Sequence, residues 1–174
     1  MTSSGTGTIL VAIDGSRNSM LAAGVGARMA KQLDAHLGLI HVLEVPTLSF
    51  WVGVETRMKD DIRAQAELSL TEIAEKMSAV CDIVPEFYIV EGLPEQEIPR
   101  VAAEDAQVMM VIAGRYGVAT EKSSHLKLRR AMGHLTTKLA EHLRVPLLVV
   151  PPDIPLSQIC AALAEMENPS PAAE

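Results

Sequence analysis

The chain has 174 residues, of which 48% are hydrophobic and only 3% aromatic, and its formal net charge at pH 7 is −7. This length and apolar content predict one domain with an aliphatic and methionine-based core, and leave some residues for a tail. The acidic balance argues against a nucleic acid or an anionic membrane surface as partner, because phosphate neutralisation requires a surplus of Lys and Arg.

Targeting signals and cysteine motifs are missing from the sequence. No apolar run approaches the about 20 residues that span a bilayer, and the polar start "MTSSGTGT" lacks the apolar region of a signal peptide. Cys81 and Cys160 form no CxxC pair, so we expect both thiols to be reduced and to serve in packing. We therefore expect a cytoplasmic protein without membrane insertion.

The first half of the chain alternates strand and helix patterns. "TILVAID" at 8–14 is rich in β-branched residues and ends in Asp-Gly-Ser, which predicts a strand and a turn. Residues 19–33 carry apolar side chains at steps of four, which predicts a helix. A second apolar strand is expected at 36–44, and a long helix with one apolar face at about 55–80.

The second half continues the alternation. A third strand is expected at 83–90, and the segment 94–106 predicts a short helix that Pro94 opens. "VMMVIA" at 108–113 predicts a fourth strand, 132–143 a last helix of the domain, and 145–150 a fifth strand.

Several of these strands are near-continuous apolar runs, which is typical of a parallel sheet that helices cover on both faces. Proline cannot donate to a strand ladder, so Pro85 places the third strand at one edge and Pro146 indicates that the fifth lies at the other. We therefore predict a doubly wound α/β fold with a five-stranded parallel sheet in the order 3-2-1-4-5. The ligand crevice of such a sheet lies at the carboxyl ends of strands 1 and 4, where the topology reverses.

Three glycines lie at this predicted crevice. Gly114 and Gly117 follow the fourth strand and would let the backbone approach a ligand, and Gly133 precedes a helix whose free N–H groups suit an anion such as phosphate. The alternative is that these glycines only turn the chain, and their spacing by itself leaves both interpretations open.

Asp14 ends the first strand and also has two interpretations. Its carboxylate could accept a hydrogen bond from a ribose or an adenine, or Asp14 or Ser16 could cap the first helix as part of an Asp-Gly turn. The pair Gly24 and Gly26 falls inside a predicted helix, so we interpret it as close packing of helix on sheet rather than as a dinucleotide fingerprint.

Patterns for catalysis or for metal binding do not appear. The histidines form no ligand cluster, and the sequence contains neither a P-loop nor a GxSxG motif. Glu72 and Glu75 belong to a solvated helix face. We predict no catalytic residue and no metal site.

One loop is unusually apolar. "TLSFWVGV" at 47–54 holds Phe50 and Trp51, although connecting segments are usually polar. It could pack on the helix expected at 55–80, close over the site, or contact a protein partner.

Five segments, in this order and at similar spacing, resemble the universal stress protein (UspA-like) family: "ILVAIDGS", "GLIHVLE", "EGLPEQEI", "VMMVIAGRYG" and "GHLTTKLAEHLRVPLLVV". The resemblance covers residues 7–151. It implies the fold of the adenine nucleotide alpha-hydrolase-like superfamily with strand order 3-2-1-4-5, in agreement with the order argued from the prolines. It also implies a homodimer paired through the strand at 145–150, whose apolar edge invites pairing.

The resemblance also implies site residues. ATP-binding members share a G-x2-G-x9-G-[S/T] pattern, which Gly114, Gly117 and Gly133 match in part. The adenosine positions of the family fall on Asp14 and Val42. The remaining candidates are Ala12, where members often have proline, Arg115 beside the first glycine, His134 and Thr136 after the last glycine, and Arg129 and Arg130 in the intervening segment.

The departures from the pattern concern the phosphate side. Fifteen residues rather than nine separate Gly117 from Gly133, and His134 replaces the hydroxyl residue. The longer segment is basic, so it could cover a phosphate or could be a solvated loop. We predict that the loop 118–130 is mobile without ligand and protected with it, and that a bound phosphate raises the pKa of His134.

Two functions follow from the resemblance. The first is a regulatory module in stress response or signalling that binds ATP or another adenine nucleotide, with Mg²⁺ an optional companion of the phosphates. The second is a nucleotide-free regulator of, for example, a transporter or channel, which would contact it through Phe50, Trp51 and the C-terminal helix. An ATP-pyrophosphatase would need an SGGxDS-like loop, which is missing, so we do not expect an enzyme, although slow ATP hydrolysis stays open.

We divide the chain into a domain at 1–152 and a segment at 153–174. The segment is expected to contain a short amphipathic helix, "LSQICAALAEM", and a disordered tail.

Overall fold

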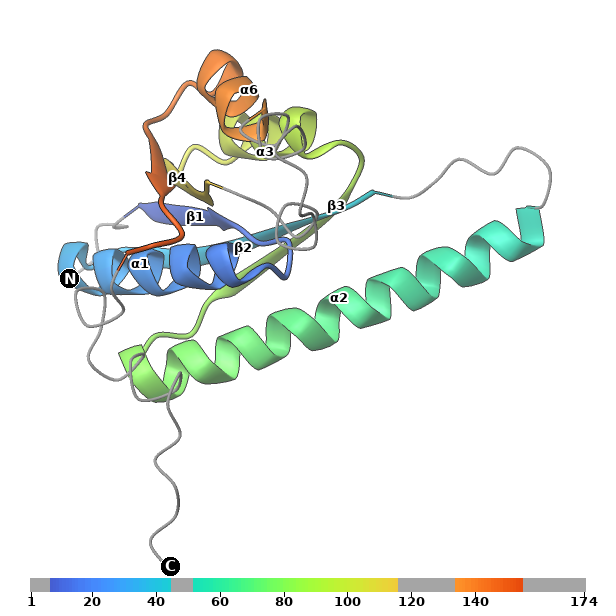
Figure 1. Ribbon diagram of the computed structural model, residues 1–174, viewed down its shortest axis with the longest axis horizontal. Helices are drawn as coiled ribbons and strands as arrows, with labels where there is room; N and C mark the ends of the chain where they lie inside the picture. Colours follow the sequence, from blue (N-terminus) through green and yellow to red (C-terminus); the bar gives the residue numbers. More distant parts are fainter. Residues whose placement is uncertain (1–6, 45–51, 116–133, 155–174) are drawn as a thin grey trace, which may run out of the picture.

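The computed structural model describes residues 7–44, 52–115 and 134–154, except for the side chains of 52–59, Val80 and His134. Five parallel strands form one sheet in the order β3-β2-β1-β4-β5 (Figure 1). The strands are β1 Thr8–Ala12, β2 His36–Leu43, β3 Glu86–Glu91, β4 Val108–Gly114 and β5 Leu147–Val150. The described helices are α1 Arg17–Leu33, α2 Val52–Cys81, α3 Pro94–Glu104 and α6 His134–His142.

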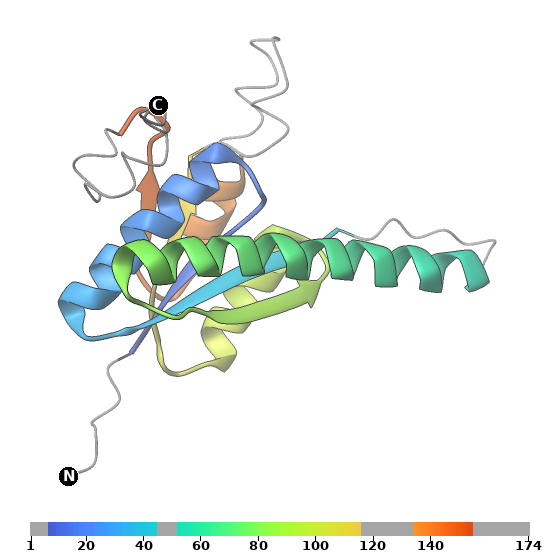
Figure 2. The same cartoon turned by 90° about the horizontal axis from the view of Figure 1, so that it is seen from below.

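Two pairs of helices cover the two faces of the sheet. Helices α1 and α2 lie on one face, and α3 and α6 lie on the other (Figures 1 and 2). Alternate residues of each strand therefore enter two separate clusters, as Val11 does on the α1/α2 face and Leu10 on the α3/α6 face. This arrangement explains the continuous apolar runs in the sequence and confirms the predicted fold class and strand order.

The edge strands are the two that the prolines indicated. Pro85 directly precedes β3 rather than lying inside it, and Pro146 directly precedes β5. The prediction that β3 starts at residue 83 was therefore wrong, but the inference about the edge was right. A proline at the entry of a strand is tolerated at an edge, because no neighbouring strand needs its missing N–H group.

Other boundaries differ by a few residues. β1 ends at Ala12 rather than at Asp14, and α1 begins at Arg17 because Ser16 caps it. Helix α2 begins at Val52, so the end of the predicted apolar loop is helical. Phe50, Trp51 and the C-terminal segment 155–174 lie outside the described residues.

Close packing of α1 on the sheet requires Gly26. A Cβ atom at this position would lie 2.5 Å from Cγ2 of Val11, a buried β1 residue. This confirms that the glycine serves helix–sheet packing rather than dinucleotide binding. Among the helices that the structure describes, none is long and apolar enough to cross a membrane.

Candidate functional site

The connection between β1 and α1 is a tight, capped turn. The backbone N–H of Ser16 donates to Oδ1 of Asp14 at 3.0 Å, and Gly15 has a φ of +79°, which glycine adopts without strain. The Ser16 hydroxyl oxygen in turn accepts from the N–H of Ser19 at 3.0 Å and caps α1. Asp14 therefore has the turn role, and its exposed side chain stands at the carboxyl edge of the sheet where a ligand could reach it.

A second connection joins α1, β4 and β5 at the carboxyl edge of the sheet. The side-chain amide of Asn18, in the first turn of α1, donates to the carbonyl oxygen of Val150 at 3.0 Å. The backbone N–H of Arg115 donates to the same oxygen at 2.9 Å. A Cβ atom on Gly114 would lie 3.0 Å from C and Cγ of Asn18. Gly114 thus has to be small, because α1, β4 and β5 meet at this point.

No pattern in the sequence indicated the role of Asn18. Its partner is 132 positions away, and no local pattern marks such a pairing. A signal was available in hindsight, since a polar residue in the first turn of a helix that lies against the sheet needs a partner when it is buried.

Ala12 and Val42 form an apolar surface beside this crevice. Both are partly buried and pack on the core cluster of the α3/α6 face. In the sheet register Ala12 pairs with Ile40 and Val42 pairs with Val90, so the side chains lie on one face at the carboxyl ends of neighbouring strands. A flat, largely apolar ring such as a nucleobase is the kind of group that this surface can hold.

His41 fixes the backbone just before Asp14. Its Nδ1 lies 2.7 Å from the carbonyl oxygen of Ile13, and since that oxygen can only accept, Nδ1 carries the proton and donates. The N–H of Ile13 donates to the Ile40 carbonyl at 2.8 Å. Together these bonds extend the β1–β2 pairing past the end of β1. The sequence had placed His41 only on a strand.

Helix α6 brings its first turn to the same edge of the sheet. It leads into β5 and runs antiparallel to it, so its N-terminus lies at the carboxyl ends of the parallel strands. Its apolar side chains join the core of the α3/α6 face, the face of Ala12 and Val42. Thr136 is partly buried in this first turn. The N–H groups and dipole of a helix N-terminus attract anions.

The predicted site residues are therefore in two groups. Six lie at the carboxyl edge of the sheet or at its crevice: Ala12, Asp14, Val42, Gly114, Arg115 and Thr136. Gly117, Arg129, Arg130 and Gly133 lie outside the described residues, and of His134 only the backbone is described.

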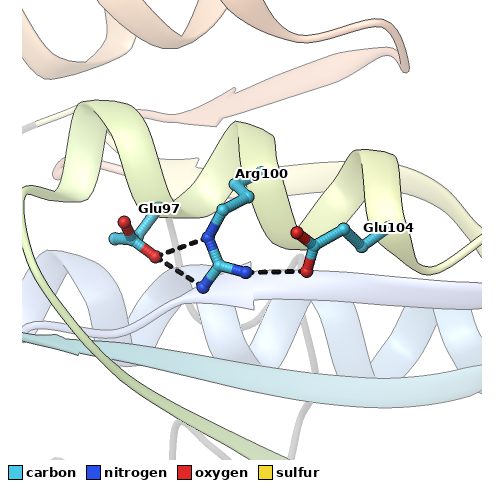
Figure 3. Close-up of polar contacts among 3 residues, drawn as sticks. All are labelled: Glu97, Arg100 and Glu104. Carbon is cyan, nitrogen blue, oxygen red and sulfur yellow. Dashed lines mark hydrogen bonds and ion pairs between the residues drawn. The ribbon is translucent and has the colours of Figure 1, made fainter.

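A charged cluster lies on α3, where Arg100 forms ion pairs with Glu97 and Glu104 (Figure 3). Nε and Nη2 of Arg100 donate to Oε2 of Glu97 at 2.8 and 2.6 Å, and Nη1 donates to Oε2 of Glu104 at 2.7 Å. These bonds, first to Glu97 and then to Glu104, raise the pKa of Arg100. The three residues are spaced as helical i, i+3 and i, i+4 pairs, so the cluster stabilises α3 rather than forming a reaction site.

In the ranges that the structure describes, no three His, Cys, Asp or Glu side chains come together as metal ligands would.

Comparison with known proteins identifies the family. The model of the universal stress protein family matches residues 5–151. The universal stress protein YxiE of Bacillus subtilis is 28% identical over 150 residues, which cover 82% of this chain and 97% of that protein. UspA from Lactobacillus plantarum has a similar solved structure, with a TM-score of 0.72 and 19% identity over 84% of this chain and 99% of that one.

Two further structures of this fold hold nucleotides. A universal stress protein in complex with cAMP has a TM-score of 0.63 and 19% identity, covering 86% of this chain and 100% of that one. The protein from Archaeoglobus fulgidus in complex with dAMP has a TM-score of 0.60 and 15% identity, covering 82% and 96%. By the match over residues 5–151 and the shared strand order, the chain belongs to the universal stress protein family.

Proposed function

We propose that this universal stress protein binds an adenine nucleotide at the carboxyl edge of its sheet and acts in the cytoplasm as a regulatory module in stress response or signalling, with little or no turnover. The observation that carries the proposal is the convergence of three features at the topological switch point of the sheet. There the exposed carboxylate of Asp14, the apolar surface of Ala12 and Val42, and the first turn of α6 share one edge of the sheet.

Each part of this edge suits one part of the ligand. The base would lie against Ala12 and Val42, and Asp14 would accept a hydrogen bond from a ribose hydroxyl. The phosphates would lie near the N-terminus of α6, where backbone N–H groups favour negative charge. The complexes of the two relatives with cAMP and dAMP support a ligand of this class. A Mg²⁺ ion would enter only as a companion of the phosphates.

A nucleotide-free regulator that acts through protein contacts is the second candidate. It is favoured by the sequence on the phosphate side, where fifteen residues separate Gly117 from Gly133 and a histidine replaces the usual hydroxyl residue. The two candidates differ in whether the purified protein binds or carries a nucleotide.

The test is calorimetric titration of the full chain with ATP, ADP, AMP, cAMP and GTP, and a mass measurement of any small molecule released on denaturation. We expect binding of at least one adenine nucleotide and weaker binding of GTP. If no adenine nucleotide binds below millimolar concentration and none is released, the nucleotide-binding proposal is wrong and the second candidate stands.

The variant Asp14→Asn tests how much the negative charge of the Asp14 side chain contributes to nucleotide binding. The asparagine keeps an oxygen that can accept from the N–H of Ser16, so the turn is retained, but the charge-assisted bond to a hydroxyl is lost. We expect the affinity for the nucleotide to fall about tenfold or more. The matched control is Asp34→Asn, which makes the same change at the end of α1, on the opposite edge of the sheet, and keeps a residue that tolerates the positive φ of 53°. Equal affinities of the two variants would remove Asp14 from the site.

A further inference from the structure

An apolar strip lies beside α1 on the α1/α2 face of the sheet. It consists of five partly buried side chains that pack on the core cluster of that face: Val25, Met29, Met110, Leu148 and Ile154. We call these residues the α1–β5 strip. They come from α1, β4, β5 and the segment that follows β5.

The register of α1 shows that its part of the strip faces β5. Asn18 reaches the Val150 carbonyl at the end of β5. Val25 and Met29 follow Asn18 by seven and eleven positions, so they lie on the same side of the helix. On the other side, Lys31 donates to the carbonyl oxygen of Cys81, the last residue of α2. The strip therefore lies on the side of α1 away from α2.

Strands β4 and β5 contribute the part of the strip that lies on the sheet. Leu148 pairs with Ile112 and Val150 with Gly114, and Leu148, Val150 and Ile112 all face the α1/α2 side. Helix α2 packs on β2 and β3, whereas α1 packs on β1 and β4 and reaches β5 with its side. In the described ranges, α1 is thus the helix that packs on β5 on this face. Figure 2 shows β5 beside α1 and away from α2.

The last described residue, Ile154, lies on the α1/α2 face of the sheet. Ile154 packs on the same core cluster as Leu148 and Val25. The residues that follow begin with Pro155, a residue favoured in the first turn of a helix. Their apolar side chains recur at helical spacing: Leu156, Ile159, Cys160, Leu163 and Met166.

The length of a helix over residues 156–166 also agrees with the length of β5. A helix over the 11 residues 156–166 would be about 16 Å long, and the four residues of β5 span about 13 Å. Starting from Ile154 at the carboxyl edge, such a helix would run back along β5 and parallel to α1, and would end near Met29 and Met110.

We propose that residues 156–166 form a helix that docks on the α1–β5 strip of the same chain and covers β5 on the α1/α2 face. The docked helix places Leu156, Ile159 and Leu163 on the strip and encloses the thiol of Cys160. The family match ends at residue 151, so this helix is an addition of this chain to the common fold. The proposal does not depend on nucleotide binding.

Short-range cross-linking tests the contact directly. Cys160 is joined by the shortest bis-methanethiosulfonate linker to a cysteine introduced as Leu148→Cys, with the buried Cys81 left in place. The matched control is Val149→Cys, the next residue of β5, whose side chain faces the α3/α6 side because its partner Ala113 belongs to that core. We expect an intrachain cross-link for Leu148→Cys, and several-fold less for Val149→Cys.

The same experiment distinguishes the proposed intrachain contact from a contact made by a second copy of the chain. A cross-linked dimer of Leu148→Cys that disappears on dilution would mean that the segment of a second copy covers the strip, and the intrachain proposal would be overturned. Equal intrachain cross-linking of both variants would overturn it as well, because the segment would then have no preferred face.

Thiol reactivity gives an independent measure. A helix that is docked nine-tenths of the time or more protects its thiol roughly tenfold or more. We therefore expect Ile159→Asp to raise the reaction rate of Cys160 by about that factor, and Gln158→Asp, on the opposite side of the helix, to leave it unchanged. Equal rates in both variants and in the original chain would contradict docking. Cys81 does not interfere, because it is only 6% exposed.

Discussion

Asn18 shows how one buried polar side chain can join three elements. The residue is 2% exposed, and its amide reaches a carbonyl at the end of β5 from the first turn of α1, beside the point where Gly114 ends β4. A buried polar group lowers stability unless it is hydrogen-bonded. The bond therefore both stabilises the fold and fixes the geometry of the crevice beside Asp14.

Asn18→Asp should lower the free energy of unfolding by about 2–3 kcal/mol, because the variant replaces a donor with a buried acceptor that faces the Val150 oxygen. Urea denaturation measures the change. The control Gln107→Glu makes the same amide-to-carboxylate change on an exposed side chain and should shift the value by no more than about 0.5 kcal/mol. A shift of Asn18→Asp as small as that of the control would show that the bond contributes little.

Tyr88 carries the clearest effect of the fold on a titrating group. Burial first, and then the hydrogen bond that its hydroxyl donates to Oδ2 of Asp105 at 3.1 Å, raise its pKa from 10.0 to about 12. The folded state therefore holds this proton more tightly than the unfolded state does. The stability that Tyr88 contributes is fully present below pH 10 and is lost as the pH rises from about 10 through about 12.

Tyr88→Phe should remove this part of the alkaline loss of stability, and the difference spectrum of phenolate absorbance should lose its late-titrating component. Denaturation at a series of alkaline pH values, with absorbance titration of the folded protein, checks both. The idea fails if the original chain and the variant lose stability in parallel across this pH range.

Helix α2 shows the difference between an element's length and its packing. Its 30 residues correspond to about 45 Å, and its N-terminal part projects beyond the sheet in both views (Figures 1 and 2). Among the α2 side chains that the structure describes, the buried ones lie from the middle of the helix onward: Ala66, Leu70, Ile73, Met77 and Cys81. They recur at helical spacing, so one face of this part of the helix packs on β2 and β3.

Two leucines of α2 form a matched pair. Leu70 is 1% exposed and Leu68 is 62% exposed. Leu70→Ala should lower the free energy of unfolding by about 2–5 kcal/mol, because it removes apolar contacts and leaves a cavity. Leu68→Ala should change it by no more than about 0.5 kcal/mol. Chemical denaturation of both variants would contradict this account of the packing if the two losses were similar.

Strand β5 is an edge of the whole sheet, and among the described strands β4 is its one neighbour. Pro146 and Val150 direct their carbonyl groups to β4, as their bonds with Val111 and Arg115 show. Because the N–H and C=O groups of one residue point the same way and alternate along a strand, Val149 directs its backbone groups away from β4. Its side chain is 38% exposed. An open apolar edge of this kind is suited to pairing with a second copy.

We expect a homodimer at micromolar concentration in light scattering, and we expect Val149→Pro to yield a folded monomer. The proline removes a donor from the open edge without touching the β4–β5 ladder. Val149→Thr keeps the donor and the branched shape, so it should stay dimeric. A monomeric original chain would rule out the β5 dimer, and a dimeric Val149→Pro variant would place the interface elsewhere.

The sequence by itself determined the architecture. Apolar runs too continuous for a half-exposed sheet require cover on both faces, and Pro85 and Pro146 favour edge positions for the strands they precede, a constraint that the order 3-2-1-4-5 satisfies. Local patterns also place Asp14 and Gly114 at the carboxyl edge of the sheet and indicate close packing at Gly26.

The side chains that hold the carboxyl edge of the sheet together become visible in the packed fold alone. Asn18 and His41 donate hydrogen bonds to the backbone carbonyl oxygens of Val150 and Ile13, which are far away in the sequence. Every residue has a backbone carbonyl, so no sequence pattern shows which one a side chain will bind. The start of α2 at Val52 was missed for a related reason, since an apolar stretch fits a loop or a helix equally well until its neighbours are known. Periodicity and proline act through the local backbone and are visible in the sequence, whereas long-range hydrogen bonds depend on where the packed core brings the chain together.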